Sequence, residues 1–377
     1  MDPSLAIYNQ LKECGVTFCV TYPGAKIQRL YELVRANIDS ISVSKEEEGV
    51  GICAGVSLAG GKPAMLIQST GLGNMINAIC SLTLTYGLPL LVLASWRGVY
   101  KETVSAQIAL GKRLPNLLKA IGCQFYEINT VKDIPKIAVA AQRAFEKPSV
   151  QIVLLSPQLW EPAQKEESTK TSTPSNSNPE EFPKLPPLEA GFLTRFEIIK
   201  ILTQHIDNQL VICNIGLPSR ELYEILDQPS NFYMLGSLGL VSSIGLGVAI
   251  KTPKPVFVID GDGSLLSNLG SLATIASVEP PNLIILAIDN RVHGSTGNQP
   301  TATSVCVDLA KTAQSLGWKH VSRAVSPEQI REIPIAPQSG PKFIHLSAKP
   351  GNAEVPTIPL TPQEIKTRFM NAIRSKH

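Results

Sequence analysis

Residues 256–264 read VFVIDGDGS, and residues 283–290 read LIILAIDN. Each segment is an aliphatic run of strand length that ends in acidic or amide side chains. Such runs, separated by a helical segment, are typical of parallel strands that helices cover on both faces. Asp262 and Asn290 follow the two runs at a separation that suits one strand–helix–strand crossover (290 − 262 = 28). We therefore expect both side chains at the carboxyl edge of one sheet, where open α/β sheets bind ligands.

Asp262 and Asn290 would offer one carboxylate oxygen and one amide oxygen to a cation. Mg²⁺ binds to few protein oxygens and completes its octahedral shell with phosphate oxygens and water. Gly261 and Gly263 would let the backbone approach a ligand closely, and Ser264 opens the next helix, whose amino terminus attracts phosphate. The residues therefore predict a magnesium diphosphate site. The alternative is a strand-to-helix turn in which the two glycines only relieve crowding.

An earlier part of the chain repeats this layout of helix, strand, glycine-rich turn, helix and strand. The offsets between corresponding positions are nearly constant (254 − 62 = 192, 261 − 71 = 190, 282 − 88 = 194). The corresponding segments are 49–56 and 241–250, 64–67 and 256–259, 70–73 and 261–263, and 88–94 and 283–288. We therefore expect a duplicated α/β unit, with two doubly wound parallel-sheet domains.

Residues 164–181 separate the repeats and contain no apolar side chain other than proline. Such a segment cannot bury enough surface to offset the entropy of ordering it. We therefore expect a first domain over residues 1–160, a flexible linker over 161–188 and a second domain over 189–377, each near the usual domain size.

The composition excludes several classes of partner. The 377 residues carry a formal net charge of +3, and lysine and arginine are scattered, so neither nucleic acid nor an anionic membrane is indicated. Seven cysteines without a CxxC pair suggest no disulfide framework and no zinc site, which suits a reducing cytoplasm. The sequence begins without a signal-like segment, and its aliphatic runs are too short to span a membrane. We expect a cytoplasmic protein with a small-molecule partner.

The pattern resembles the thiamin diphosphate enzymes, whose signature is Gly-Asp-Gly followed about 25 to 30 residues later by Asn. The resemblance covers nearly all of the chain except the linker. It implies a pyrimidine-binding first domain, a diphosphate-binding second domain, and thiamin diphosphate with Mg²⁺ as cofactors. The metal ligands that it implies are Asp262, Asn290 and the backbone carbonyl of Val292, and the diphosphate contacts are Gly261, Gly263 and Ser264.

Glu46 matches the family's activating glutamate, which lies nine residues before a glycine on a helix of the other domain (55 − 46 = 9). The resemblance implies that this carboxyl group bonds to the aminopyrimidine ring and favours its imino tautomer, which serves as an internal base. Glu47 takes this role if the helix starts one residue later. From the local sequence alone, residues 46–48 could instead form a solvated acidic first turn.

Residues 236–239, Gly-Ser-Leu-Gly, resemble the family segment that supports the bent cofactor. The resemblance implies contacts from Gly236, Ser237 and Leu238. Leu238 would hold the two rings in a V, and the Gly236 carbonyl would accept from the 4′-amino group. The segments 22–24, 70–74 and 87–92 also resemble the family's pyrimidine-binding domain.

The two-domain layout, together with the segments 46–51, 95–98 and 294–301, looks like the sulfopyruvate decarboxylase family, here with both halves fused. The implied reaction is decarboxylation of 3-sulfopyruvate to sulfoacetaldehyde and carbon dioxide, a step toward coenzyme M. Phosphonopyruvate decarboxylase is the close relative and the first alternative. The sulfonate needs cationic or hydrogen-bonding partners, although loop cations are mostly solvated. The candidates are Arg97, Gln107, Lys112, Arg113 and His293.

In this family the glutamate and the metal motif usually meet between chains, so the resemblance implies a homodimer or larger homo-oligomer. A cofactor-binding scaffold without turnover is a second class of function, but the intact Glu46, Asp262 and Asn290 argue against it. A dinucleotide-dependent dehydrogenase is disfavoured because Leu266 occupies the place of the third glycine of GxGxxG.

Overall fold

The computed structural model describes residues 2–24, 26–163, 191–207, 209–335 and 339–375. Most of the predicted linker, 161–188, lies outside these residues, apart from the end of the 3₁₀ helix η4 (Pro157–Ala163). The proposed domain boundaries therefore stay a prediction. None of the described helices is long and apolar enough to cross a lipid bilayer.

The first domain is built on a six-stranded sheet in the order β2-β1-β3-β4-β6-β5, and every neighbouring pair is parallel. Its strands are β1 (Phe18–Thr21), β2 (Ser40–Ser42), β3 (Pro63–Gln68), β4 (Leu90–Ser95), β5 (Gln124–Ile128) and β6 (Val150–Leu155). Its α-helices are α1 (Pro3–Glu13), α2 (Gln28–Asn37), α3 (Glu46–Leu58), α4 (Leu72–Ala78), α5 (Ser105–Gly111), α6 (Leu114–Ala120) and α7 (Lys136–Glu146). Short helices η1 (Ser69–Gly71), η2 (Ile79–Leu84) and η3 (Val131–Asp133) complete it.

The second domain holds a six-stranded sheet in the order β13-β14-β10-β9-β7-β8, again parallel throughout. Its strands are β7 (Leu210–Cys213), β8 (Asn231–Tyr233), β9 (Val256–Gly261), β10 (Leu283–Asp289), β13 (His320–Ala324) and β14 (Lys342–Ser347). Its α-helices are α8 (Arg195–Leu202), α9 (Leu217–Ile225), α10 (Val241–Lys251), α11 (Asp262–Ser267), α12 (Gly270–Val278), α13 (Leu309–Ser315), α14 (Pro327–Glu332) and α15 (Pro362–Arg374). An antiparallel hairpin of β11 (Val292–His293) and β12 (Gln299–Pro300) and the turns η5 (Thr203–His205) and η6 (Ala302–Ser304) complete it.

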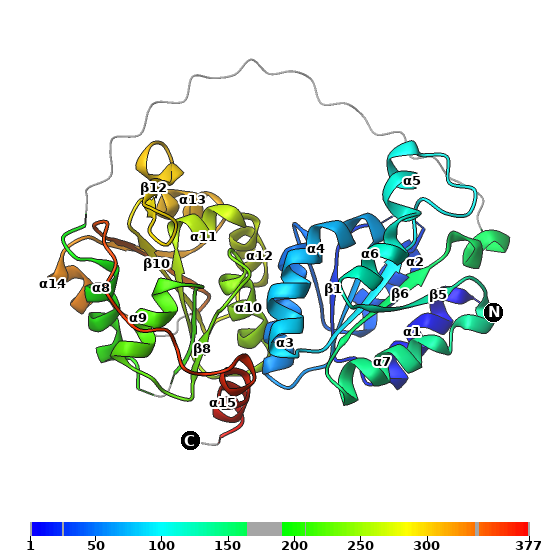
Figure 1. The fold of residues 1–377 in the computed structure, drawn as a ribbon, viewed down its shortest axis with the longest axis horizontal. Helices are drawn as coiled ribbons and strands as arrows, with labels where there is room; N and C mark the ends of the chain where they lie inside the picture. Colours follow the sequence, from blue (N-terminus) through cyan, green and yellow to red (C-terminus); the bar gives the residue numbers. More distant parts are fainter. Residues whose placement is uncertain (1, 25, 164–190, 208, 336–338, 376–377) are drawn as a thin grey trace, which may run out of the picture.

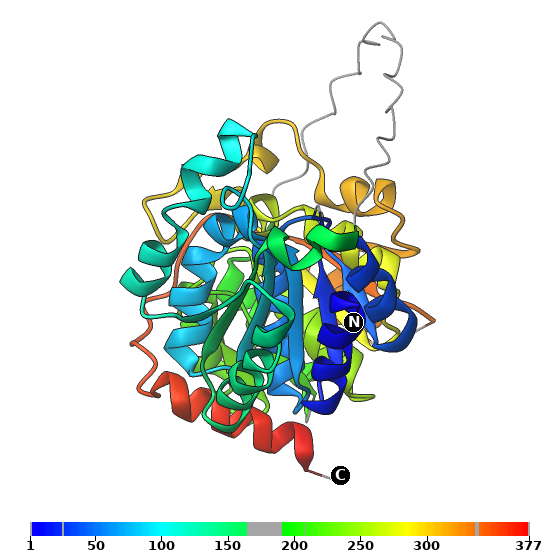
Figure 2. The same cartoon turned by 90° about the vertical axis from the view of Figure 1, so that its right-hand side faces the viewer.

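Read from β8, the second sheet has the order β8-β7-β9-β10-β14-β13, which repeats the strand order of the first. The duplicated α/β unit and the fold class are therefore confirmed. Figure 1 shows the two domains side by side, with α3 and α10 between the sheets. Figure 2 shows α15 along the edge of the molecule opposite to β12 and α5.

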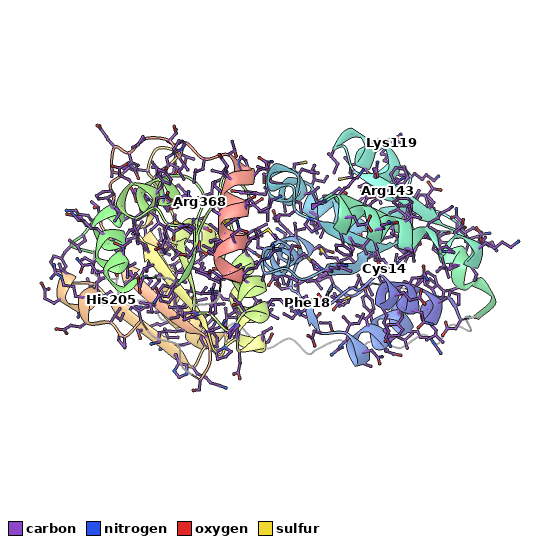
Figure 3. All side chains as sticks on the ribbon, turned by 90° about the horizontal axis from the view of Figure 1, so that it is seen from below. Cys14, Phe18, Lys119, Arg143, His205 and Arg368 are labelled. Atoms are coloured by element: carbon purple, nitrogen blue, oxygen red, sulfur yellow. The ribbon has the colours of Figure 1, made fainter. Side chains whose placement is uncertain are left out.

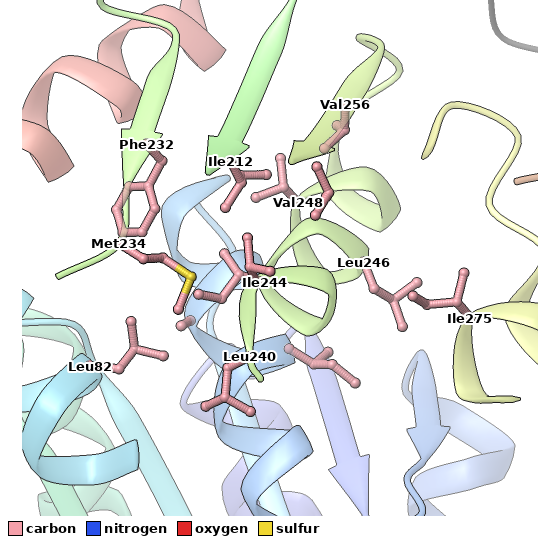
Figure 4. Packing of buried hydrophobic residues seen from close by; sticks show 14 of the residues in the cluster. Leu82, Ile212, Phe232, Met234, Leu240, Ile244, Leu246, Val248, Val256 and Ile275 are labelled. Atoms are coloured by element: carbon pink, nitrogen blue, oxygen red, sulfur yellow. The ribbon is translucent and has the colours of Figure 1, made fainter. Parts of the chain in front are cut away.

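The two domains share one apolar core. Helices α1, α2 and α7 cover the outer face of the first sheet and form a separate buried cluster there. The larger cluster begins on the inner face of that sheet and continues through α3 and α10 into the second domain. Figure 4 shows this continuity, with Leu82 of the first domain near Met234 and Leu240 of the second. Burial of this size favours a fixed arrangement of the two domains.

Helices α3 and α10 cross with their backbones almost in contact. A Cβ atom on Gly55 would lie 2.1 Å from the carbonyl oxygen of Ile244, and one on Gly247 would lie 2.2 Å from that of Ile52. Tyr86 of the first domain donates to the Tyr233 carbonyl of the second (2.7 Å). Lys251 of α10 lies over the ring of Phe18, which Figure 3 labels, at 5.0 Å.

The first and last helices both have side-chain caps at their amino termini. Asp2 caps α1 by accepting from the amide of Ser4, and Thr361 with Glu364 forms the capping box of α15. The α15 helix ties the domains together because Lys366 donates to the Gly87 carbonyl of the first domain (3.0 Å). The C-terminal helix therefore has a structural role.

Candidate active site

Three polar side chains follow neighbouring strands at the carboxyl edge of the second sheet. Asn214 follows β7, Asp262 follows β9 and Asn290 follows β10. The register pairs Ile288 with Gly261, so Asp262 and Asn290 leave adjacent strands almost level with each other. The predicted meeting of these two residues at one sheet edge is confirmed.

A cavity of about 280 Å³ opens at this edge. Whole-ligand pockets usually have about 300–1,000 Å³, so this volume suits one polar part of a larger ligand. Residues from the ends of β7, β9 and β10 line it together with the β11 hairpin. Its lining includes Asn214, Gly216, Leu238, Gly261, Asp262, Gly263, Ser264, Asn290, Val292 and His293.

Asp262 is buried and strongly held. Thr301 and Thr303 both donate hydrogen bonds to its Oδ2 atom, and Thr303 also donates to Asp289 (2.8 Å). Burial, and then the charge of Asp289, raises the pKa of Asp262 to about 6. A cation beside this carboxylate would offset both effects, since it favours the charged form. The residue therefore fits a cation site.

Among the described residues, no group of three or more histidine, cysteine, aspartate and glutamate side chains forms a metal cluster. A metal here would therefore depend on Asp262, Asn290, backbone oxygen, phosphate and water, which are the hard ligands that Mg²⁺ prefers. The carbonyl of Val292 accepts from the amide of Gly294 at 3.1 Å and lies in the hairpin beside the cavity.

The diphosphate candidates also lie at this cavity. A Cβ atom on Gly263 would lie 2.5 Å from the imidazole of His293, so a larger residue there would require that ring to move. The hydroxyl of Ser264 is buried and makes no well-aligned hydrogen bond, although it lies near enough to the Asp260 carboxylate to counter part of the rise that burial causes in the pKa of Asp260. A phosphate oxygen in the cavity would offer this hydroxyl a well-aligned acceptor. The turn thus fits an oxyanion better than a purely structural role.

The turn at residues 236–239 lies where the two domains meet. Ser237 has a left-handed backbone (φ 61°), which is uncommon outside glycine, and its hydroxyl lies 2.6 Å from that of Ser81. A Cβ atom on Gly236 would lie 2.6 Å from the Ser81 carbonyl. Leu238 remains 48% exposed and lines the cavity. Strained backbone held by its neighbours is frequent at functional sites.

Glu46 is the first residue of α3 and is only 5% exposed. Asn74 donates to its Oε2 atom (3.0 Å), and a Cβ atom on Gly71 would lie 2.3 Å from its Oε1. Glu47 instead faces Lys45 in a surface ion pair (2.8 Å), and Glu48 accepts from Ser44 (2.9 Å). The solvated acidic turn is therefore wrong for Glu46, and the geometry favours Glu46 over Glu47 as the functional carboxylate.

The candidate sulfonate ligands do not form one cluster. Arg97 makes a bidentate pair with Glu102 (2.6 and 3.1 Å), which lowers the pKa of that carboxyl to about 2. Gln107 lies on α5 with a buried carbonyl oxygen that has no hydrogen-bond partner among the described residues. Lys112 and Arg113 are exposed, and His293 lies at the cavity of the other domain.

The sequence patterns did not predict several residues that lie at the site. Asn214 follows a strand, so the strand-end rule that selected Asp262 could have found it. Asn74 and Thr301 lie in segments that resemble the family, but their bonds to Glu46 and Asp262 depend on tertiary contacts. Arg195, which also lines the cavity, carries no local signal at all.

Comparison with known proteins agrees with this geometry. The family model "Thiamine pyrophosphate enzyme, N-terminal TPP binding domain" matches residues 1–115, and the corresponding C-terminal TPP binding domain matches residues 214–346. A solved structure of a thiamine diphosphate-dependent 4-hydroxybenzoylformate decarboxylase from Rhodococcus jostii is similar in fold, with a TM-score of 0.71 and 13% identity. The similarity covers 94% of this chain and all of that one.

The curated relatives are more specific. A sulfopyruvate decarboxylase from Methanosarcina acetivorans is 41% identical over 100% of this chain and 99% of its own length. A sulfopyruvate decarboxylase subunit beta from Methanococcus maripaludis is 50% identical over 48% of this chain and 98% of its own length. A phosphonopyruvate decarboxylase from Streptomyces viridochromogenes is 34% identical, over 87% of this chain and 84% of its own. The chain is therefore an enzyme of the decarboxylase type and belongs to the thiamin diphosphate-dependent family of the sulfopyruvate decarboxylases.

Proposed function

We propose that the protein decarboxylates 3-sulfopyruvate to sulfoacetaldehyde and carbon dioxide, with thiamin diphosphate and Mg²⁺, in coenzyme M biosynthesis. The observation that carries the proposal is the 41% identity over the whole chain to a sulfopyruvate decarboxylase. The seven free cysteines support a reducing compartment, and we infer a cytoplasmic enzyme.

The cofactor would lie across the two domains. Asp262, Asn290 and the Val292 carbonyl would hold Mg²⁺, and Gly261, Gly263 and Ser264 would contact the diphosphate. The half-exposed Leu238 would be covered by the bent cofactor, with Gly236 and Ser237 beside it. When bound, the thiazolium ring supplies a carbon nucleophile and an electron sink for the pair that carbon dioxide leaves behind.

Glu46 would hold the proton that activates this ring. Asn74 fixes one carboxylate oxygen, so the other can exchange a proton with the pyrimidine ring. The low exposure of Glu46 keeps bulk water from competing for that proton. Glu46→Gln replaces the carboxyl group by an amide of similar size that cannot exchange the proton. We therefore expect the rate of carbon dioxide release to fall at least about 100-fold.

Glu47→Gln is the matched control, because Glu47 neighbours Glu46 but faces Lys45 at the surface. We expect its turnover to stay within about twofold of the wild type. Cofactor affinity, measured by calorimetry, should persist in both variants. Unchanged turnover in Glu46→Gln would refute the assigned role.

Substrate choice is tested by steady-state kinetics. The protein is stripped of ions with a chelator, resupplied with Mg²⁺ and thiamin diphosphate, and assayed on sulfopyruvate and phosphonopyruvate. We expect a higher kcat/KM for sulfopyruvate, and no turnover before Mg²⁺ is returned. The opposite preference would favour the phosphonopyruvate decarboxylase that the 34% identical relative suggests. Absence of Mg²⁺-dependent cofactor binding would overturn the proposal altogether.

The candidate ligands of the sulfonate lie mostly in the first domain. Arg97 and Gln107 both neighbour η1, whose Gly71 contacts Glu46: the Arg97 amide donates to Ser69 (2.9 Å), and α5, which carries Gln107, packs on η1. For Arg97 to bind the sulfonate, it would have to share its guanidinium with Glu102. Lys112 is exposed, and His293 would approach from the diphosphate side.

We also infer a homodimer or larger homo-oligomer with its sites between chains, as the family resemblance implies. Sulfopyruvate decarboxylase from M. maripaludis has a separate beta subunit, which supports an assembly of domains from more than one chain. Here one chain pairs its own domains through α3 and α10, so exchange of domains between chains would have to reproduce that contact.

A further inference from the structure

Arg195 is a buried arginine at the diphosphate cavity that none of the roles above uses. It is the first residue of α8 and is only 7% exposed. It lines the same cavity as Asp262 and Ser264. Because α8 runs antiparallel to the strand that follows it, its first residue lies at the carboxyl edge of the sheet, on the ligand side.

Hydrogen bonds to Glu221 and Asn352 fix the guanidinium group of Arg195. Nε and Nη2 donate to the two carboxylate oxygens of Glu221 on α9 (2.7 and 2.8 Å), and Nη2 also donates to Asn352 (3.0 Å). Asn352 in turn donates to the Gly294 carbonyl in the hairpin (2.9 Å). Glu221 is fully buried, so the pair is a rigid bidentate one.

The third guanidinium nitrogen, Nη1, takes no part in the bonds to Glu221 and Asn352. A guanidinium carries five N–H donors, and the bonds to Glu221 and Asn352 use only those on Nε and Nη2. None of these bonds uses Nη1, which lies near Gly294 at the rim of the cavity, where an added Cβ atom would be 3.6 Å away. The guanidinium stays charged, and the N–H groups on Nη1 can donate charge-assisted hydrogen bonds to an oxyanion.

Other donors face the same cavity. The buried hydroxyl of Ser264 comes from the turn after β9, and Gly216 caps the nine-residue helix α9, whose amino terminus carries partial positive charge. Arg195, Ser264 and the start of α9 belong to three different elements. Their convergence fits one tetrahedral oxyanion beside the proposed metal ligands.

We propose that Nη1 of Arg195 binds the terminal phosphate of thiamin diphosphate, and that Glu221 and Asn352 are positioning residues for it. The inference rests on the proposed cofactor but not on the proposed substrate. The terminal phosphate is the chosen oxyanion because Arg195 lines the same cavity as Asp262, Asn290 and Ser264, the proposed ligands of the magnesium diphosphate.

The test compares thiamin diphosphate with thiamin monophosphate, which lacks the terminal phosphate. Binding to the full-length protein with Mg²⁺ is measured by calorimetry, and folding is checked by circular dichroism. The double variant Arg195→Met/Glu221→Met removes Nη1 without leaving Glu221 as an unpaired buried charge. We expect the Kd of thiamin diphosphate to rise at least about tenfold, and that of the monophosphate to change less than about twofold.

Two further variants keep the test decisive. Arg195→Lys retains the charge, but an ammonium held by Glu221 leaves no second nitrogen for the phosphate, so the same selective loss is expected if the double variant does not fold. Arg323→Met is the matched control, because Arg323 pairs with Asp308 in the same domain but lies outside the cavity lining. It should leave both affinities unchanged.

Equal weakening of both ligands would overturn the proposal and leave Arg195 as a structural residue. An unchanged Kd for thiamin diphosphate with a raised KM for sulfopyruvate would also overturn it, because the oxyanion would then be the sulfonate. Wild-type protein that binds the cofactor but does not decarboxylate sulfopyruvate would contradict the proposed substrate and leave this inference intact.

Discussion

At the residue scale, the site depends on small residues that make room for reactive ones. Gly71 leaves space for the Glu46 carboxylate, and Gly263 leaves space for the ring of His293. The glycine-rich motifs of the sequence are usually explained by a flexible backbone. In this protein their main effect at these positions is the volume that they leave free.

Gly71→Ala should therefore impair the enzyme without unfolding it. The new methyl group would overlap Glu46, whose side chain can move away but then loses its bond to Asn74. We expect kcat to fall at least about tenfold while the thermal midpoint changes by only a few degrees.

Gly73→Ala is the control for this change, because its methyl group would meet only Leu110 at an ordinary 3.7 Å. It should leave kcat within about twofold of the wild type. A Gly71→Ala enzyme with normal kcat would contradict the packing argument.

The pair of Arg97 and Glu102 should make stability depend on acidity. Folding lowers the pKa of Glu102 from 4.5 to about 2, chiefly through the hydrogen bond from Arg97. The pair therefore stabilises the fold above pH 4.5, and this contribution disappears as the pH falls toward 2. Glu102→Gln should lower the free energy of unfolding by about 1 kcal/mol at pH 7, because solvent screens part of the interaction.

Urea denaturation at pH 7 and pH 3 measures this effect. The difference between the wild type and Glu102→Gln should shrink at the lower pH. Glu354→Gln, at an exposed position, is the control and should change neither value. A difference that grows on acidification would contradict the stated direction of the pKa shift.

At the scale of elements, the strands and their order were predictable because buried parallel strands are continuous aliphatic runs. β10, predicted over 283–288, is observed over Leu283–Asp289, and β3, predicted over 64–67, extends by one residue at each end. The strand ends also located Asp262 and Asn290. The partners of those residues were not predictable, because Thr303 and Arg195 approach the site through tertiary packing that no local pattern records.

The crossing of α3 and α10 gives an element-scale prediction. Gly55→Ala would place a methyl group against the backbone of α10, which cannot move as a side chain can. We expect a loss of about 1–3 kcal/mol in the free energy of unfolding, together with lower turnover because α3 carries Glu46.

Thermal or urea unfolding checks the stability, with Gly73→Ala as the control for a glycine-to-alanine change in a helix. That control should be neutral or slightly stabilising, since alanine favours helix. A fully stable Gly55→Ala protein would show that the two helices can separate more easily than their contact suggests.

At the scale of the whole molecule, the question is whether one chain or two complete a site. Chains carrying Glu46→Gln and chains carrying Asp262→Asn are each expected to be inactive. If the sites lie between chains, as proposed, random mixing into dimers rebuilds one intact site in each mixed dimer and should restore about a quarter of the wild-type activity.

Co-expression with two affinity tags, followed by purification through both, isolates the mixed dimers, whose expected activity is then about half of the wild type. Mixing one inactive variant with itself under the same conditions is the control. Activity no greater than that control would mean that Glu46 and Asp262 of the same chain work together across α3 and α10.

The meeting of Gly55 with Gly247 limits how the two halves can diverge over evolutionary time. Elsewhere in a core, a larger residue on one side can be accommodated by a smaller one opposite. Here both positions already hold the smallest amino acid, so no compensating replacement exists. Both glycines should therefore be retained as the rest of each half changes in sequence. The same holds where the two halves are encoded separately, provided that they pair in the same way.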